Sequence, residues 1–214
     1  DINSCRYVAE AYLQKKWAFV ADYVRFYVLY NEGGIYLDTD MEMVRSFEPL
    51  RKHKAFFGFA TDGLTLPVFG SEAKTDFIAD MLDYHKRSFI KLDGTYDTTP
   101  LDVPALRILK EKYGLIENYQ YQELADGTAI YPKQYFYSTD ANTGKITKYP
   151  ELFCIHYADA SWLSDDVKAE LIRRRRLVKI LGEKLGLYVD AFINYLFKDG
   201  LLTALKKTFS VLRR

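Results

Sequence analysis

The sequence contains only two cysteines in 214 residues, Cys5 and Cys154. This number is too small for the disulfide scaffold of a small secreted domain. We expect no signal peptide, and no uninterrupted apolar run approaches the roughly 20 residues that cross a bilayer. From these absences we expect a chain that works in the reducing cytoplasm.

The net charge of +1 gives no excess of one sign, but the charges are unevenly distributed. Acidic residues outnumber basic ones up to residue 164, and basic residues dominate from 165 onward. Because the body is acidic and carries no nucleic-acid motif, we expect no nucleic-acid partner. The hydrophobic fraction of 49% is sufficient for a full core, and 18 Tyr and 14 Phe make the chain unusually aromatic.

The most informative stretch is residues 17–44. Its first half predicts a helix, in which Asp22 and Arg25 share one face because they are three positions apart. Apolar residues recur at helical spacing, and we expect them to form the core face: Trp17, Val20, Ala21, Val24 and Val28.

A double glycine, Gly33 and Gly34, ends this predicted helix. Residues 35–37 then form a short strand that leads to Asp38 and Asp40, which face the same side because they are two positions apart. Paired carboxylates with hard oxygen atoms suit Mg²⁺ or Mn²⁺, ions that also hold substrate phosphates. A pair of solvated turn aspartates is the alternative, since D-x-D is a short motif.

Two segments together resemble a known family. AFVADYVRFYVLYNEGGIYLDTDMEM (residues 18–43) resembles the SDxxR…LYxxGGxYxDxD signature of glycosyltransferases with a DXD sugar-binding region, with Ala21 where serine is common. CIHYADASW (154–162) is similar to the C-terminal His…Ser-Trp element of that family. These are retaining, family 32-like enzymes with the GT-A fold, found in capsular polysaccharide synthesis and in the glucosyltransferase domains of clostridial toxins. The IPKxIHxxW-like opening of the family has no counterpart here, so we expect the nucleotide-binding strand to be missing.

The resemblance implies a catalytic group of four residues. Asp22 would bind the ribose or the sugar, and Arg25 a sugar hydroxyl or the glycosidic phosphate oxygen. Asp38 would contact ribose and sugar hydroxyls and the water shell of a Mn²⁺ or Mg²⁺ ion. Asp40 would bind that ion directly.

The resemblance also implies further donor-binding residues. His156 would be a metal ligand or a phosphate contact, while the Ser161 hydroxyl and the Trp162 indole would donate to the diphosphate. Tyr36 joins this set by its place in the motif. Thr99 lies in a polar loop (92–100) that would cover the donor, although Asp97, Thr98 and Thr99 are equally suited to cap the next helix.

The rest of the sequence predicts alternating helices and strands. We expect a helix from Asn3 or Ser4 to about residue 16, strands at 41–44, 55–59 and 66–69, and helices at 74–91 and 102–113. A strand pair at 119–124 and 128–131 and a last strand at 152–155 follow. The predicted fold class is α/β: a GT-A-like three-layer domain with a mixed sheet over residues 1–163, followed by a C-terminal helical tail over 164–214.

That tail predicts basic amphipathic helices around a run of four arginines, residues 173–176. Residues 165–214 suit an anionic membrane surface, to which each cation contributes on the order of 1 kcal/mol. Packing on the body, or binding a partner, is the alternative.

The predicted function is that of a metal-dependent hexosyltransferase. It would move a sugar from a UDP- or GDP-sugar to a saccharide or lipid-linked acceptor in surface polysaccharide synthesis. We expect it in the cytoplasm, with attachment to the inner face of the plasma membrane left open. Two alternatives are an inactive glycosyltransferase-like binding module and a haloacid-dehalogenase-type phosphatase, which also places D-x-D after a strand.

Overall fold

The computed structural model describes residues 5–140, 142–158 and 163–200. The chain divides into two compact units. The first comprises Asp1–Thr139 and Thr147–Tyr157, and the second comprises Asp140–Ile146 and Ala158–Arg214. The boundary expected between residues 163 and 164 stays a prediction.

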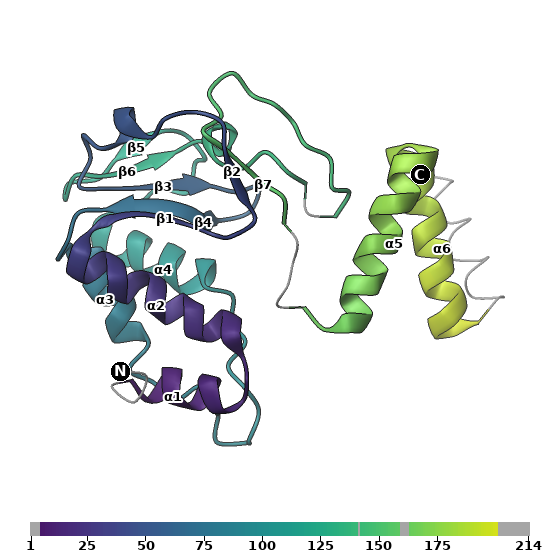
Figure 1. Ribbon diagram of the computed structural model, residues 1–214, viewed down its shortest axis with the longest axis horizontal. Coiled ribbons are helices and arrows are strands. Elements are labelled where there is room, and N and C mark those ends of the chain that lie inside the picture. Colours follow the sequence, from purple (N-terminus) through teal and green to yellow (C-terminus); the bar gives the residue numbers. More distant parts are fainter. Residues whose placement is uncertain (1–4, 141, 159–162, 201–214) are drawn as a thin grey trace. The chain divides into compact units, whose positions relative to one another are not determined.

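A five-stranded mixed sheet forms the centre of the first unit (Figure 1). Its spatial order is β1-β4-β3-β6-β5. The strands are β1 (Gly34–Leu37), β3 (Ala55–Phe59), β4 (Leu64–Ser71), β5 (Gln122–Glu123) and β6 (Thr128–Tyr131). β3 and β6 run parallel, whereas the other neighbours are antiparallel.

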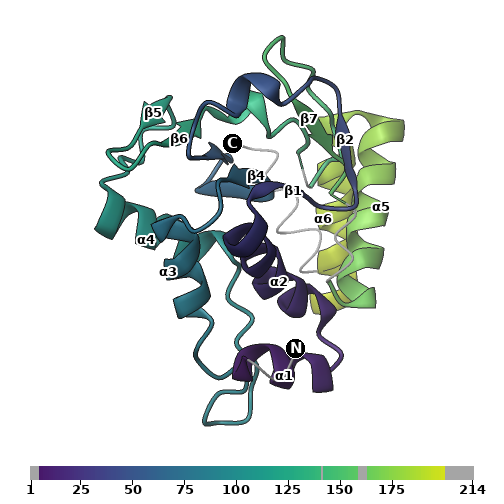
Figure 2. The same cartoon turned by 60° about the vertical axis from the view of Figure 1, so that its left-hand side comes forward.

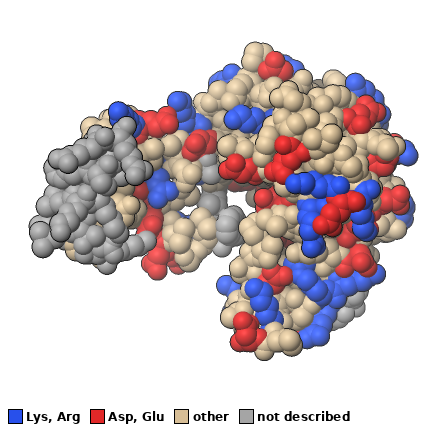
Figure 3. Space-filling model, turned by 180° about the vertical axis from the view of Figure 1, so that it is seen from behind, with Lys and Arg blue, Asp and Glu red and all other residues tan. Residues whose placement is uncertain are grey.

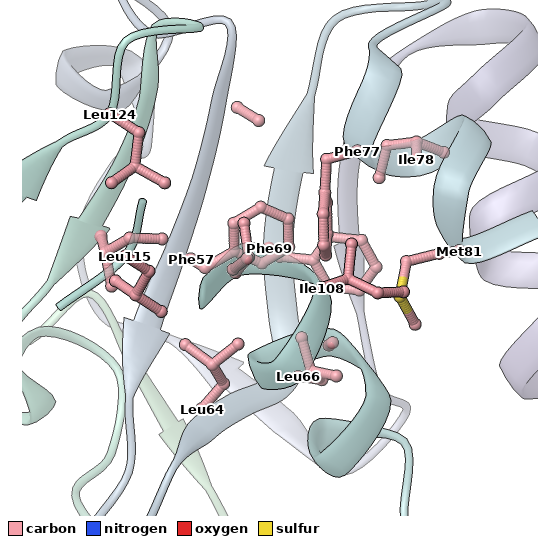
Figure 4. Close-up of a cluster of buried hydrophobic side chains, with 14 of the residues drawn as sticks. Phe57, Leu64, Leu66, Phe69, Phe77, Ile78, Met81, Ile108, Leu115 and Leu124 are labelled. Atoms are coloured by element: carbon pink, nitrogen blue, oxygen red, sulfur yellow. The ribbon is translucent and has the colours of Figure 1, made fainter. Parts of the chain in front are cut away.

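Three helices cover one face of this sheet: α2 (Trp17–Glu32), α3 (Asp76–Tyr84) and α4 (Asp102–Tyr113). Their apolar side chains meet those of the strands in the largest core cluster. In Figure 4, Phe57 and Phe69 of the sheet lie against Phe77 and Met81 of α3. A shorter helix, α1 (Arg6–Leu13), packs a separate apolar cluster around Phe89.

The other face of the sheet is covered by irregular segments. These include the single 3-10 turns η2 (Glu48–Leu50) and η3 (Lys133–Tyr135). β2 (Met41–Met43) and β7 (Cys154–His156) form a second, two-stranded antiparallel sheet (Figure 2). The predicted mixed α/β class is confirmed, and the architecture is consistent with a GT-A-like fold.

Acidic and basic side chains are interspersed over this unit on the face shown in Figure 3. No field of a single sign covers that face. This face therefore has no large patch of one charge that would attract a strongly charged partner.

Three sequence predictions about helices were wrong. The first helix ends at Leu13 rather than about residue 16, and α3 ends at Tyr84 rather than at residue 91. The predicted core face of α2 was also wrong, because Trp17 is 55% exposed while Phe26 and Leu29 are buried. Apolar residues occur all around α2, so their spacing does not fix which side faces the sheet.

The second unit contains two antiparallel helices, α5 (Asp165–Leu181) and α6 (Glu183–Asp199), joined at Gly182. The two backbones lie close together at Gly186, where an added Cβ would lie 2.5 Å from the Val178 backbone. Among the described residues, no helix is long and apolar enough to cross a membrane.

Candidate functional site

The end of α2 and the start of β1 place the DXD segment. Gly33 adopts φ +69°, and a Cβ on it would lie 2.9 Å from the Ala73 amide nitrogen, so only glycine fits without displacing that backbone. β1 then pairs with β4, and the Asp38 amide donates to the Pro67 carbonyl at 2.8 Å. The Met41 amide donates to the Asp38 carbonyl at 3.2 Å, which closes a turn around the two aspartates.

Arg25 connects helix α2 to the DXD segment. Its guanidinium lies 3.0 Å from an Asp22 oxygen and 3.5 Å from Asp38 Oδ1, and it donates to the Leu66 carbonyl at 3.2 Å. It also lies over the Tyr36 ring, 4.4 Å from the centroid. The side chain is only 10% exposed, so these contacts fix its position. The predicted proximity of Asp22 and Arg25 is thus present in the structure.

Tyr36 contacts both Asp38 and Arg25. Its hydroxyl donates to Asp38 Oδ1 at 2.5 Å, and its ring makes a cation–π contact with the Arg25 guanidinium. Burial raises the pKa of Tyr36, and the neighbouring Asp38 carboxylate acts in the same direction, so the phenol remains a donor at neutral pH.

Asp22 is an unusual carboxylate. Burial raises its pKa to about 6, with Arg25 acting in the opposite direction and Asp38 raising it further. Carboxylates with raised pKa values are frequent at functional sites, because burial and neighbouring charges there disfavour the ionised form.

Asp38, Asp40 and His156 form a cluster suited to a metal ion. One potential ligand atom from each residue lies within 4.8 Å of the other two. His156 Nε2 lies 3.3 Å from Asp40 Oδ2. The second sheet creates this proximity, because Met41 is registered against His156 and the Tyr157 amide donates to the Asp40 carbonyl at 3.0 Å.

Thr99 is held within its own loop. Its amide and its hydroxyl donate to Asp97 Oδ1 at 3.1 and 2.6 Å, and Arg87 Nε donates to the other Asp97 oxygen at 2.7 Å. No side chain caps α4, whose N-cap position is Leu101, so the capping alternative was wrong. Within the described chain, no hydrogen bond connects Thr99 to the Asp22–Arg25–Asp38 group. Its donor-binding role stays a prediction.

Ser161 and Trp162 lie outside the described residues, and their predicted roles stay predictions. Sequence reasoning missed the backbone carbonyls of Leu66 and Pro67, which fix Arg25 and Asp38. Every residue has a backbone carbonyl, so the sequence alone does not single out those of Leu66 and Pro67. They become recognisable only once β1 is known to pair with β4.

The comparison with known families bears on this geometry. Residues 3–57 match the family described as a glycosyltransferase sugar-binding region containing a DXD motif. The match spans α1 to β3 and includes Asp22, Arg25, Asp38 and Asp40, while His156 lies outside it. No curated protein and no solved structure matches the chain. The chain therefore carries a sugar-binding region of the glycosyltransferase type, which supports a sugar transferase at this general level.

Proposed function

We propose that the protein is a metal-dependent glycosyltransferase that uses a nucleoside diphosphate sugar, such as a UDP- or GDP-sugar, as donor. One observation carries this proposal. The Asp38–Asp40–His156 cluster lies directly beside the Asp22–Arg25 pair, and all of these residues except His156 belong to the segment that matches a sugar-binding DXD region.

The ligand set of this cluster fits a divalent transition metal. Two ligands about 2.1 Å from one ion at right angles are about 3.0 Å apart, close to the 3.3 Å between Asp40 Oδ2 and His156 Nε2. An imidazole nitrogen beside two carboxylates suits Mn²⁺ better than Mg²⁺, which prefers oxygen atoms. When bound, such an ion neutralises negative charge on the departing diphosphate.

Side chains next to the metal cluster would orient the sugar donor and its diphosphate. Arg25 presents a guanidinium that is already held by Asp22 and the Leu66 carbonyl, so little side-chain entropy is lost on binding an anionic oxygen. Asp22 can accept a hydrogen bond from a sugar hydroxyl when it is ionised. Tyr36 keeps Asp38 and Arg25 in fixed positions, which is the pre-organisation that electrostatic stabilisation requires.

The finer features of the reaction are proposed from the sequence resemblance. They are retention of the anomeric configuration, transfer to a saccharide or lipid-linked acceptor, and a role in surface polysaccharide synthesis. Thr99, Ser161 and Trp162 complete the proposed donor site on the same basis.

A screen of UDP- and GDP-sugars with and without Mn²⁺ tests this proposal. We expect Mn²⁺-stimulated release of the nucleoside diphosphate from at least one donor, and a loss of about 100-fold or more in Asp40→Ala. The control is Asp83→Asn, an exposed aspartate paired with Lys86. Equal turnover by wild type and Asp40→Ala would contradict the mechanism. Failure to bind either Mn²⁺ or any donor would instead favour the inactive binding module.

A further inference from the structure

Three of the four arginines at 173–176 make hydrogen bonds within the second unit. Arg173 and Arg174 each direct Nε to a different oxygen of Asp190, at 2.9 and 2.8 Å, and Asp190 is only 2% exposed. Arg175 donates to the Ala158 carbonyl at 2.8 Å. Arg173 and Arg174 therefore join α5 to α6, and Arg175 is bonded to the backbone before α5, so these three are not the cations that a partner would meet.

Other cations lie at the turn between α5 and α6. Arg176, Lys179 and Lys184 are exposed, and within the described part of the chain none of them makes a hydrogen bond or an ion pair. The acidic residue of this region, Glu183, is paired with Lys145 at 3.2 Å, which offsets its charge. Residues 176–185, which we call the hairpin tip, therefore have a net positive charge.

The hairpin tip is also apolar. Ile180 is 71% exposed and Leu185 53% exposed, and Leu181 between them is exposed as well. A Cβ placed on Gly182 would meet no atom within 4 Å, so the turn itself has open space around it. The turn forms one end of the hairpin, where α5 gives way to α6 (Figure 1).

Exposed apolar side chains interspersed in sequence with exposed cations fit the interface of an anionic membrane. The apolar side chains reach the acyl boundary while the cations meet lipid headgroups. We propose that the hairpin tip docks the protein on an anionic lipid surface through Ile180, Leu181 and Leu185, with Arg176, Lys179 and Lys184 contacting the headgroups. Charge complementarity selects this partner, because a soluble apolar partner gains nothing from three cations around its docking site. The inference does not rest on the proposed function.

Sedimentation of the full chain with lipid vesicles tests the inference. We expect binding to phosphatidylcholine vesicles that contain about one third phosphatidylglycerol, weak binding to phosphatidylcholine alone, and loss of binding at high salt. The double variant Lys179→Gln/Lys184→Gln should bind about 25-fold more weakly, because each lost cation weakens binding about fivefold. Ile180→Ser/Leu185→Ser should also bind more weakly.

Matched variants separate the tip from general charge. Lys52→Gln/Lys148→Gln removes two exposed lysines of the first unit and should change binding less than about twofold. Asp40→Ala should bind vesicles like wild type, which keeps this result separate from the transferase activity. Circular dichroism should show the same helix content in every variant.

Three outcomes would overturn the inference. They are absence of wild-type binding to anionic vesicles, equal binding by the two lysine double variants, and binding that ignores lipid charge. A concentration-dependent dimer that Ile180→Ser/Leu185→Ser abolishes, without vesicle binding, would identify a second copy of the chain as the partner instead.

Discussion

Replacing Asp22 by asparagine should change how the stability of the first unit depends on pH. Asp22 has a pKa of about 6 in the folded protein, against an ordinary value of 3.8. Burial is the main cause, and the Arg25 guanidinium at 3.0 Å only partly offsets it. The folded state therefore binds the Asp22 proton more tightly than the unfolded state does.

The sign and size of the effect follow from this difference. Below about pH 4 the carboxyl is protonated in both states. Between about pH 4 and pH 6 the unfolded chain ionises first, so the free energy of unfolding falls as pH rises. Each pKa unit corresponds to about 1.36 kcal/mol, so ionised Asp22 lowers the free energy of unfolding by about 3 kcal/mol above pH 6. The asparagine side chain of the variant does not titrate and avoids this loss.

Urea unfolding of wild type and Asp22→Asn between pH 4 and pH 8 measures the effect. The stability of the variant relative to wild type should rise by about 1.4 kcal/mol per pH unit between pH 4 and pH 6, and then level off. Asp83→Asn should show no such rise, because that carboxylate is exposed. A relative stability of Asp22→Asn that stays flat or falls with pH would contradict a raised pKa of Asp22. It would mean that Arg25 stabilises the charge more than burial disfavours it.

Three further substitutions test other parts of the structure. Tyr36→Phe removes the hydroxyl that donates to Asp38 but keeps the ring beneath Arg25, so calorimetry should show Mn²⁺ affinity reduced about tenfold with the fold intact. Gly186→Ala should weaken the α5–α6 hairpin by about 1–3 kcal/mol, seen as faster amide exchange in both helices, because its Cβ would meet backbone atoms. Glu10→Gln should lower the free energy of unfolding at pH 7 by about 1–3 kcal/mol in urea titrations, since the carboxylate accepts from Ser88 and from the backbone amides of Phe89 and Ile90. Unchanged Mn²⁺ affinity in Tyr36→Phe, unchanged amide exchange in Gly186→Ala, or unchanged stability in Glu10→Gln would contradict the respective expectation.

Local signals in the sequence predicted several elements well. The strand at 55–59 and the helix at 102–113 have the predicted bounds, and Gly114 ends that helix in the left-handed conformation. The limits of α3 could not be predicted this way. Beyond the end of α3, the amides of Phe89 and Ile90 donate to Glu10, and these contacts join positions about 80 residues apart.

In the candidate site, too, local spacing was predictable from the sequence, whereas contacts between distant positions were not. Spacing predicted that Asp22 and Arg25 share a helix face and that Asp38 and Asp40 share one side of the chain, because helix and strand geometry are local. Only the family resemblance joined the two pairs into one group. His156 could be included only through the family resemblance, since β2 and β7 bring it to Asp40 across more than one hundred residues. The internal use of Arg173 and Arg174 was not predictable either, because their partner Asp190 is reached only when the hairpin forms.

Calorimetric titration of Mn²⁺ into wild type, Asp40→Asn and Asp83→Asn measures whether Asp40 belongs to a metal site. We expect one Mn²⁺ site in wild type and in Asp83→Asn, and an affinity at least about tenfold weaker in Asp40→Asn. The affinity for a nucleoside diphosphate should rise when Mn²⁺ is present. Equal Mn²⁺ affinity in all three proteins would contradict the assignment of Asp38, Asp40 and His156 as the site that holds the diphosphate.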